Sequence, residues 1–568
     1  MATVDEVPSR SPVPLQWELA QQTEIFLEDS LYPQAYSLLY NVLASGAILS
    51  NKAVIPQPQH LAVAATMLVH PRTTTRAESG YEKEAANAAL RLLRLTNSLV
   101  GPMDAKFDIA FSFTHFESSR QGRRRLESPM PVDPVDPDTK PLNTKYNQSA
   151  SLWTRAEDFW HAVGWAFNCS VLHPARWERW QVWLQFICNV LEDDWKEREK
   201  KYLEAKLNQR EISKSSEKSG REASQGPDSA EKKGRKGDKP DEQVVDDLAI
   251  FRESLIFRYI SSNTTPGRDR RIMRAIFANG KSSLGEFKQV FNNELKSPEH
   301  EQDSRTTKKR AGDVDFDKDE YGDYLDVSDE DFEAGESSSS VSTPAHGSKG
   351  NKPRRSKRTR RGTRNAMDEA SDPVEVAETP LKNSSLSLLG GYTSLALRQQ
   401  LLAILSSVSE KLPREFISLD YLYHIFVENI RDLPLPIFQH FVSSNLPHFL
   451  PEEHTTLCEL LLYVMRESSA PSSNNDYLTQ VKLEKCFLPY AAATPSVGNN
   501  AKVSILLEAL MTLLYNNKML CVTPSLKKAV ESGITRRERA SRDRSSVEWT
   551  YLQESGLRMK FMVEHILP

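Results

Sequence analysis

The chain has 568 residues with 73 basic and 77 acidic side chains, and its formal net charge of −4 points to no particular class of partner. Its five cysteines form no closely spaced pair, which excludes a disulfide framework and a zinc module and indicates a reducing compartment. No secretory signal pattern opens the sequence and no run of about 18 apolar residues occurs, so we expect a soluble intracellular protein.

Apolar residues recur at helical spacing throughout the N-terminal part. Residues 15–28 and 36–44 predict an opening helical hairpin, with Pro33 placed to start the second helix. Residues 61–69 form a short apolar segment that we expect to be buried. The strongest pattern covers 81–100, where a helix rich in Ala, Leu and Arg is closed by a Gly-Pro pair. Its predicted core face contains Ala86, Ala89, Leu93 and either Ser98 or Leu99.

Residues 107–116 (FDIAFSFTHF) alternate in the manner of a strand, but no partner strand is visible nearby. Because a lone strand cannot satisfy its backbone, we expect a helical or irregular segment. Residues 129–141 contain five prolines and predict an exposed loop.

Seven of the nine tryptophans lie within 151–200, where the pattern predicts two amphipathic helices joined at residues 172–174. In the first helix Trp153, Trp160 and Phe167 share one face, and in the second Trp177 and Trp180 begin another. Further apolar residues widen the second face, so this helix should be buried on most sides. The predicted core of the pair comprises Trp153, Trp160, Trp177, Trp180, Trp183 and Leu184.

Two other interpretations of the tryptophan cluster are a ligand cage and a platform for stacking nucleobases, since indole faces bind both cations and bases. Stacking platforms combine exposed aromatic side chains with basic residues, whereas these tryptophans recur at helical spacing, which favours core packing. The pattern leaves open whether Trp165 or Trp195 is exposed to hold a partner helix.

A charged continuation from Lys196 predicts a helical extension that frays into a Ser-, Lys- and Gly-rich segment at 213–242. Amphipathic helices are then predicted at 245–261, 268–277 and 284–295, and we expect them to pack back on the N-terminal helices.

In the C-terminal part, Thr393 or Ser394 is expected to cap a helix over 395–408. The basic run 535–544 (TRRERASRDR) is mixed with acidic residues and is interpreted as a flexible loop. Further helices are predicted at 416–430, 438–446, 455–466, 503–515 and 560–566.

These patterns predict an all-α fold, an irregular helical bundle in two blocks separated by long disordered segments. Because no repeat of fixed period is visible, a solenoid is an alternative only in a degenerate HEAT-like form. The expected organisation is a disordered tail (1–14), an N-terminal helical block (15–205), a disordered loop (206–243), helices packing on the first block (244–298), a disordered acidic and basic linker (299–388) and a C-terminal helical block (389–568).

The segment 352–364 (KPRRSKRTRRGTR) carries eight basic residues in thirteen. Such density in a segment poor in apolar residues indicates a nuclear import signal, and the same cations would suit a phosphate-binding arm. Base-specific readout is not indicated, because no aromatic side chains are interleaved. The candidate residues are Lys308, Lys309 and Arg310 upstream, and Lys352, Arg354, Arg355, Lys357, Arg358, Arg360 and Arg361 in the run.

Residues 313–336 contain twelve acidic residues and one lysine. Within them, an apolar strip directly before an acidic serine resembles a SUMO-interacting motif, in which a short extended segment adds to a sheet edge. The same residues fit an acidophilic kinase site at Ser328, or a tract that only solvates the chain. The candidate residues are Leu325, Val327, Ser328, Asp329, Glu330 and Asp331.

The sequence contains no phosphate-binding loop, dinucleotide motif, nucleophile elbow or Cys/His pair at metal spacing, so we predict no catalytic, cofactor or metal site. His161 and His173 are interpreted as packing or capping residues. We expect a non-catalytic nuclear scaffold or interaction subunit of a chromatin, genome-maintenance (DNA repair) or transcription-related complex.

Its expected partners are other protein subunits, SUMO and weakly bound nucleic acid, without membrane association. One alternative is a sequence-nonspecific nucleic-acid-binding protein that uses 352–364 and 232–239 as basic arms. A less favoured one is an enzyme with an unrecognised site.

Overall fold

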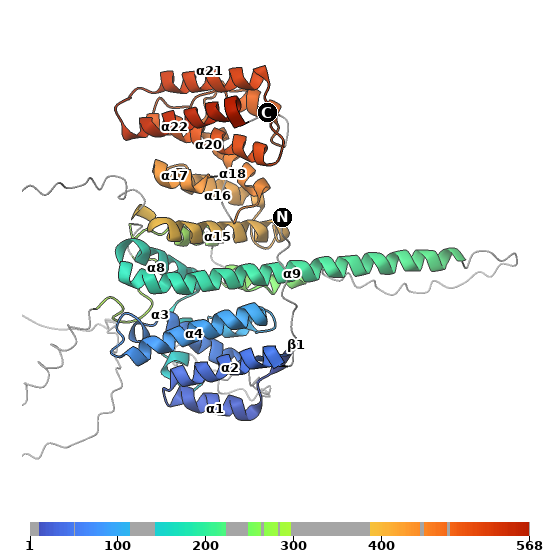
Figure 1. The fold of residues 1–568 in the computed structure, drawn as a ribbon, viewed down its shortest axis with the longest axis vertical. Helices are drawn as coiled ribbons and strands as arrows, with labels where there is room; N and C mark the ends of the chain where they lie inside the picture. The colour runs from blue at the N-terminus through green and yellow to red at the C-terminus, as the bar shows by residue number, and fades with distance from the viewer. Residues whose placement is uncertain are drawn as a thin grey trace, which may run out of the picture. The chain divides into compact units, whose positions relative to one another are not determined.

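A computed structural model of the chain describes residues 11–49, 52–113, 142–222, 248–262, 266–281, 285–296, 387–443, 448–473 and 477–566. Helices make up nearly all of the regular structure in these ranges, so the all-α prediction is confirmed. The described residues before 298 and after 379 belong to one compact unit (Figure 1).

The N-terminal residues form a strand pair and a helical hairpin. Strand β1 (Ser11–Pro14) pairs in parallel with β2 (Lys52–Ile55), and α1 (Trp17–Glu28) and α2 (Tyr32–Leu49) lie between them in the chain. The predicted disordered tail is therefore wrong for residues 11–14. Two prolines hide this strand from sequence reasoning, yet an edge strand tolerates them because one side of its backbone is not in the ladder. The predicted hairpin is confirmed.

The apolar segment that was expected to be buried is helix α3 (Pro58–Val69), and all of its residues are buried. Helix α3 contacts α4 (Gly80–Leu99), which also packs on α2, and it contacts α9 (Pro174–Glu222). The predicted core face of α4 is confirmed, with Leu99 as the alternative that packs against the core while Ser98 is exposed. Thr96 is also buried on this face and donates a hydrogen bond to the Leu92 carbonyl.

The first tryptophan helix is interrupted, contrary to the prediction. Helix α7 (Leu152–Arg155) ends at Ala156, and α8 (Phe159–Leu172) begins after Asp158, whose carboxylate accepts a hydrogen bond of 2.7 Å from the His161 backbone N–H. This N-cap satisfies the first turn of α8 and makes the break stable. The predicted junction at 172–174 is confirmed, because α8 ends at Leu172 and α9 begins at Pro174.

Helix α9 continues to Glu222. A disordered loop was predicted from residue 206 and fraying of the helix from residue 213, so the helix is longer than either prediction. Ion pairs one turn apart stabilise the charged part of α9 before residue 206, with Lys196 to Glu192 at 2.6 Å and Lys201 to Glu197 at 2.8 Å.

The predicted helix 245–261 is two short helices, α10 (Ala249–Arg252) and α11 (Leu255–Ser261). The Ser254 hydroxyl caps α11, and the backbone N–H of Leu255 donates a hydrogen bond of 2.9 Å to Asp194 of α9, so the chain turns at this point. The next helix, α12 (Arg268–Ile276), agrees with the prediction.

Residues 285–296 form turns instead of the predicted helix. Gly285 and Asn293 have φ angles of +93° and +57°, in the left-handed region that ends a right-handed helix. The ring of Phe287 lies directly on Gly164 of α8, where a Cβ would come within 2.4 Å of it. Tertiary contacts with α8 and α9 therefore decide the shape of this segment.

The C-terminal part is helical, but several boundaries differ from the prediction. Helix α15 (Gly391–Lys411) begins after Gly390, whose φ of +79° suits glycine, so neither Thr393 nor Ser394 is its cap. The segment 535–544 is not a loop over most of its length, because α21 (Pro524–Ala540) includes residues 535–540. The other long helices are α16 (Leu419–Ile430), α17 (Leu435–Phe441), α18 (Pro451–Met465), α20 (Val497–Asn516) and α22 (Val547–Phe561).

Short elements complete the described chain. They are η1 (Pro71–Thr73), α5 (Phe107–Ala110), η3 (Lys145–Asn147), η4 (Ser387–Leu389), α19 (Gln480–Lys482), and the π-helical turns η5 (Leu483–Phe487) and η6 (Met562–Ile566).

Contacts run from one end of the described chain to the other. Helix α15 packs on α8 and α9, α16 packs on α15 and on α12, and α18 links α16 to α20, which α22 covers. The buried Arg398 of α15 donates hydrogen bonds to the carbonyls of Ile276 and, at 2.9 Å, Ala278, at the end of α12. Its guanidinium carbon also lies 3.9 Å from the centre of the Phe167 ring of α8. One arginine thus joins helices from both parts of the sequence.

Candidate functional site

The clustered tryptophans lie in the core. Trp177, the most exposed of the seven, is only 7% exposed, and Trp165 and Trp195 are buried as well. Neither Trp165 nor Trp195 is therefore exposed to hold a partner helix. The residues predicted to form the core of the helix pair, Trp153, Trp160, Trp177, Trp180, Trp183 and Leu184, are all buried.

Indole N–H groups tie this core to distant segments. Trp153 donates to the Ala62 carbonyl of α3 at 3.0 Å, and Trp160 donates to the Tyr259 carbonyl of α11 at 3.1 Å. A ligand cage or a stacking platform needs a ring face that is open to solvent, and these rings are covered by protein. We therefore describe the cluster as packing.

The strongest polar feature beside the tryptophans is a buried ion pair. Glu294, from the turns at 285–296, accepts hydrogen bonds from Arg176 Nε at 2.9 Å and from Trp180 Nε1 at 2.7 Å. The remaining Arg176 donors bind the Val69 carbonyl and the Thr74 hydroxyl. Both side chains are almost fully buried and well supplied with partners, as a buried charge requires, so the pair anchors a loop and has no free group for chemistry.

The two histidines that flank the tryptophans serve packing and capping. His161 Nδ1 accepts from the Glu157 backbone N–H at 3.1 Å, and Nε2 lies 3.0 Å from the Lys288 carbonyl. Burial lowers the pKa of His161 and that of His173, which ends α8. Among the described residues, no group of three or more His, Cys, Asp and Glu side chains is placed to hold a metal ion.

The charged arms singled out in the sequence lie outside the described residues. This holds for the basic residues of 308–310 and 352–361 and for the SUMO-like motif at 325–331. Their roles stay predictions from sequence.

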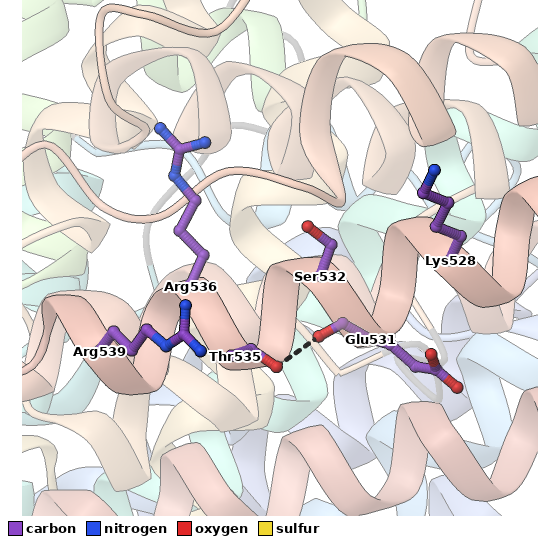
Figure 2. Close-up of a pocket in the computed structure, with 6 residues that line it drawn as sticks. All are labelled: Lys528, Glu531, Ser532, Thr535, Arg536 and Arg539. Carbon is purple, nitrogen blue, oxygen red and sulfur yellow. Dashed lines mark hydrogen bonds between the residues drawn. The ribbon is translucent and has the colours of Figure 1, made fainter.

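A basic surface follows the exposed side of α21, and sequence reasoning missed it because it interpreted the basic run 535–544 as a loop. Its side chains surround a shallow pocket of about 470 Å³ (Figure 2). We call this surface the α21 basic face. It comprises Lys528, Glu531, Ser532, Thr535, Arg536 and Arg539.

The opposite side of α21 packs tightly against η5 and the residues that follow it. Gly533 packs so closely on η5 that a Cβ would lie 1.8 Å from the Leu488 carbonyl oxygen. The fully buried Arg537 donates to the same carbonyl at 2.9 Å and to that of Tyr490 at 3.2 Å, and burial lowers the pKa of Arg537 to about 10. The run of arginines therefore mixes one core residue with exposed ones.

The cations of the α21 basic face differ in availability. Arg536 forms a two-pronged pair with Glu467, with both N–O distances at 2.9 Å. Lys528 and Arg539 have no ion pair within the described part of the chain, and both are exposed. Lys528 and Arg539 are separated by about three turns of α21, roughly 16 Å along the helix axis. Each cation could therefore bind a separate phosphate or carboxylate group by charge-assisted hydrogen bonds.

Exposed apolar pairs on two helices are the second surface feature that sequence reasoning missed. On α9, Leu203 and Leu207 are 59% and 58% exposed, and on α22, Leu557 and Phe561 are 67% and 55% exposed. Each pair is one helical turn apart, so its side chains are neighbours. The signal for the first pair was two leucines, four residues apart, in an otherwise charged helical stretch.

No described helix is long and apolar enough to cross a membrane. We compared the chain with models of known protein families, with curated proteins and with solved structures, and none of them matches it.

Proposed function

We propose that this chain is a non-catalytic nuclear scaffold or interaction subunit of a chromatin, genome-maintenance or transcription-related complex. The observation that carries the proposal is the exposure of paired large apolar side chains on α9 and α22. Grouped apolar side chains on a folded surface are typical of protein–protein contacts.

The nuclear part of the proposal rests on the basic run 352–364. Eight cations in thirteen residues suit the acidic surface of an import receptor, and the upstream cluster at 308–310 would add to them. The assignment to chromatin, repair or transcription follows from this expected location.

Affinity purification of the full chain from nuclei tests the proposal. Stoichiometric protein partners should co-elute at moderate salt and remain after nuclease treatment, because apolar contacts depend little on ionic strength. A chain that elutes as a lone monomer at every salt concentration would contradict it. The double variant Leu557→Glu with Phe561→Glu should lose any partner bound at α22, while a double variant of exposed polar residues on α4, Lys83→Glu with Arg94→Glu, should not.

A second candidate function, binding of nucleic acid without sequence preference, is favoured by the α21 basic face. Lys528 and Arg539 would neutralise phosphates together with the basic arms, and the affinity should fall steeply as salt rises. Charge reversal of both residues should weaken binding of a DNA duplex and reduce the slope of log affinity against log salt. If Lys83→Glu with Arg94→Glu weakens binding equally, the effect is one of net charge and the site is not supported.

The SUMO interpretation stays a separate proposal. A peptide of residues 320–335 should show chemical-shift changes on titration with SUMO, centred on Leu325 and Val327, if the apolar strip adds to a sheet edge. The absence of any change would end this idea without affecting the others.

A further inference from the structure

The first helix of the described chain exposes apolar and acidic side chains on one side. On α1, a tryptophan, a glutamine and an isoleucine follow one another at steps of four residues, and two carboxylates come one turn after the isoleucine. A further glutamate lies seven residues before the isoleucine, and all of these residues are exposed. We call this surface the α1 outer side, and it comprises Trp17, Glu18, Gln21, Ile25, Glu28 and Asp29.

The α1 outer side is open to solvent. The opposite side of the helix carries the buried Ala20, Thr23 and Leu27, and α1 packs on α2. In Figure 1, α1 lies beside α2 at the lower edge of the drawn helices. Trp17 is 71% exposed and Ile25 is 45% exposed. A large exposed indole is the kind of side chain that anchors protein–protein contacts, so this surface offers a partner two apolar anchors.

The charge around these anchors is entirely negative. Residues 11–49 contain four carboxylates, at Glu18, Glu24, Glu28 and Asp29, and no Lys, Arg or His. None of the four forms an ion pair within the described part of the chain. A partner that covers the anchors is therefore favoured if it brings cations, because an acidic partner would be repelled.

The same charge opposes two other occupants. A second copy of α1 carries the same four carboxylates and no cation, so pairing of two copies meets like-charge repulsion. Anionic lipid head groups would be repelled in the same way, and helices that lie on membranes carry Lys and Arg on their polar side.

We propose that the α1 outer side binds a basic amphipathic helix of a partner protein. Trp17 and Ile25 are eight residues apart, about 12 Å along the helix axis, close to the spacing of about 10.5 Å between apolar residues seven apart on a partner helix. Cations of the partner would pair with Glu28 and Asp29, and an arginine would also stack on the exposed indole. This inference rests on the proposed role as an interaction subunit and deepens it, because it names the chemistry of one partner.

The test uses the full chain and a synthetic probe. The probe is a fluorescent peptide of three heptads with leucine at the two seam positions and arginine at the flanking positions, where mutual repulsion keeps it from pairing with itself. A matched peptide carries glutamate in place of each arginine. Fluorescence anisotropy measures the binding of both peptides to the wild-type chain and to its variants. We expect the basic peptide to bind the wild-type chain and the acidic peptide not to bind.

Removal of the apolar anchors tests their part in binding. Trp17→Ala with Ile25→Ala should weaken binding of the basic peptide by about tenfold or more, since apolar anchors dominate such interfaces. The control variant Leu557→Ala with Phe561→Ala truncates an exposed apolar pair on α22 and should leave binding unchanged.

Charge reversal tests the part of the carboxylates. Glu28→Lys with Asp29→Lys should weaken binding of the basic peptide at low salt and have little effect at high salt, because attraction between exposed charges is screened. The control Asp420→Lys with Glu428→Lys on α16 changes the net charge equally and should weaken binding much less. All the substituted side chains are exposed, so thermal melting should be unchanged.

Several outcomes would overturn the inference. Equal binding of both peptides, or binding that survives Trp17→Ala with Ile25→Ala, would show that the α1 outer side does not bind a basic helix. Equal weakening by the two charge variants would reduce the effect to net charge, and dimerisation lost in the Trp17 and Ile25 variant would assign the surface to a second copy. If nuclear partners co-elute but the basic peptide does not bind, this inference alone fails. If the peptide binds as expected but nuclear purification gives no partner, the proposed nuclear role fails and the surface stands.

Discussion

Glu294 illustrates how one buried side chain fixes a segment that has no regular structure. Its carboxylate accepts hydrogen bonds from Arg176 and Trp180 of α9 and from the backbone N–H of Phe291, which closes its own turn at 3.2 Å. The segment 285–296 is thereby attached to the tryptophan core. No local sequence pattern predicts that this carboxylate is buried, because its side-chain partners in α9 are more than a hundred residues away.

Truncation of Trp180 tests this description. Trp180→Ala should lower the free energy of unfolding by about 3 to 5 kcal/mol, because it leaves a large cavity and removes one donor from the buried Glu294 carboxylate. The measurement is urea unfolding followed by circular dichroism. Trp17→Ala, which truncates a tryptophan that is 71% exposed, is the control and should change little. Similar stability of the two variants would contradict the core assignment.

His60 of α3 predicts an acid sensitivity. It is fully buried and has no hydrogen-bond partner among the described residues, and burial lowers its pKa to about 3, against 6.5 in the unfolded chain. Between these values the unfolded state binds a proton that the folded state does not, so stability falls as the pH drops below about 6.5, by up to about 1.4 kcal/mol per pH unit.

The variant His60→Leu removes this group and should flatten the dependence of the urea midpoint on pH between 6.5 and 4.5. His70, whose pKa burial also lowers to about 3, would still contribute a slope of its own. Parallel curves for the wild-type chain and the variant would mean that His60 is not buried as a neutral group.

Gly533 predicts a steric effect. Gly533→Ala would place a Cβ 1.8 Å from the Leu488 carbonyl oxygen, so α21 must move away from η5 and weaken the Arg537 hydrogen bonds. We expect a loss of about 3 kcal/mol in thermal or urea unfolding. Gly80→Ala, at the start of α4 with open space around it, is the matched control and should be neutral or slightly stabilising. A tolerated Ala at 533 would exclude this close approach.

For the helices, the sequence predicts where they form better than where they are interrupted. The periodic stretches become α4, α8, α9, α12 and α20, because each apolar row meets a neighbouring helix. The breaks at Asp158 and Ser254 escaped prediction. Both side chains cap the next helix, but Ser and Asp are also found inside helices, so only the tertiary contacts of the following turn decide whether they start one.

Arg398 tests whether α12 and α15 depend on each other. Arg398→Met should destabilise the fold by about 3 kcal/mol, because two buried carbonyls at the end of α12 lose their donors. Arg398→Lys should recover little, since one ammonium group cannot reach both carbonyls and Ser394 as the planar guanidinium does. The measurement is thermal unfolding, and a lysine variant that melts like the wild-type chain would contradict the role of the guanidinium geometry.

For the whole chain, the described helices belong to one compact unit, and the basic run 352–364 lies outside the described residues. Replacing the eight basic residues of 352–364 by glutamine should leave the melting temperature of the helical unit unchanged, because none of the described contacts involves them. It should also shift a fluorescently tagged chain toward the cytoplasm, because the proposed import signal loses its cations. Nuclear retention of this variant would place the import signal elsewhere.

The candidate surfaces were harder to predict than the fold. For the α21 basic face, the arginines at 536, 537 and 539 look alike in sequence, yet the first pairs with Glu467, the second is buried and the third is free within the described residues. For Leu203 and Leu207, the helical spacing was visible in the sequence, but spacing alone does not tell a buried leucine from an exposed one. Exposure depends on which helices pack nearby.

Local sequence patterns are enough to predict the all-α class, the positions of most long helices and the apolar character of the tryptophan pair. These features follow from local periodicity, since a helix buries one side whatever covers it. The packing of distant segments establishes that all seven clustered tryptophans are covered, that Glu294 enters the core from a turn, and that Leu203 and Leu207 are exposed to water. Such outcomes depend on contacts between residues far apart in the chain, and local patterns carry no record of them.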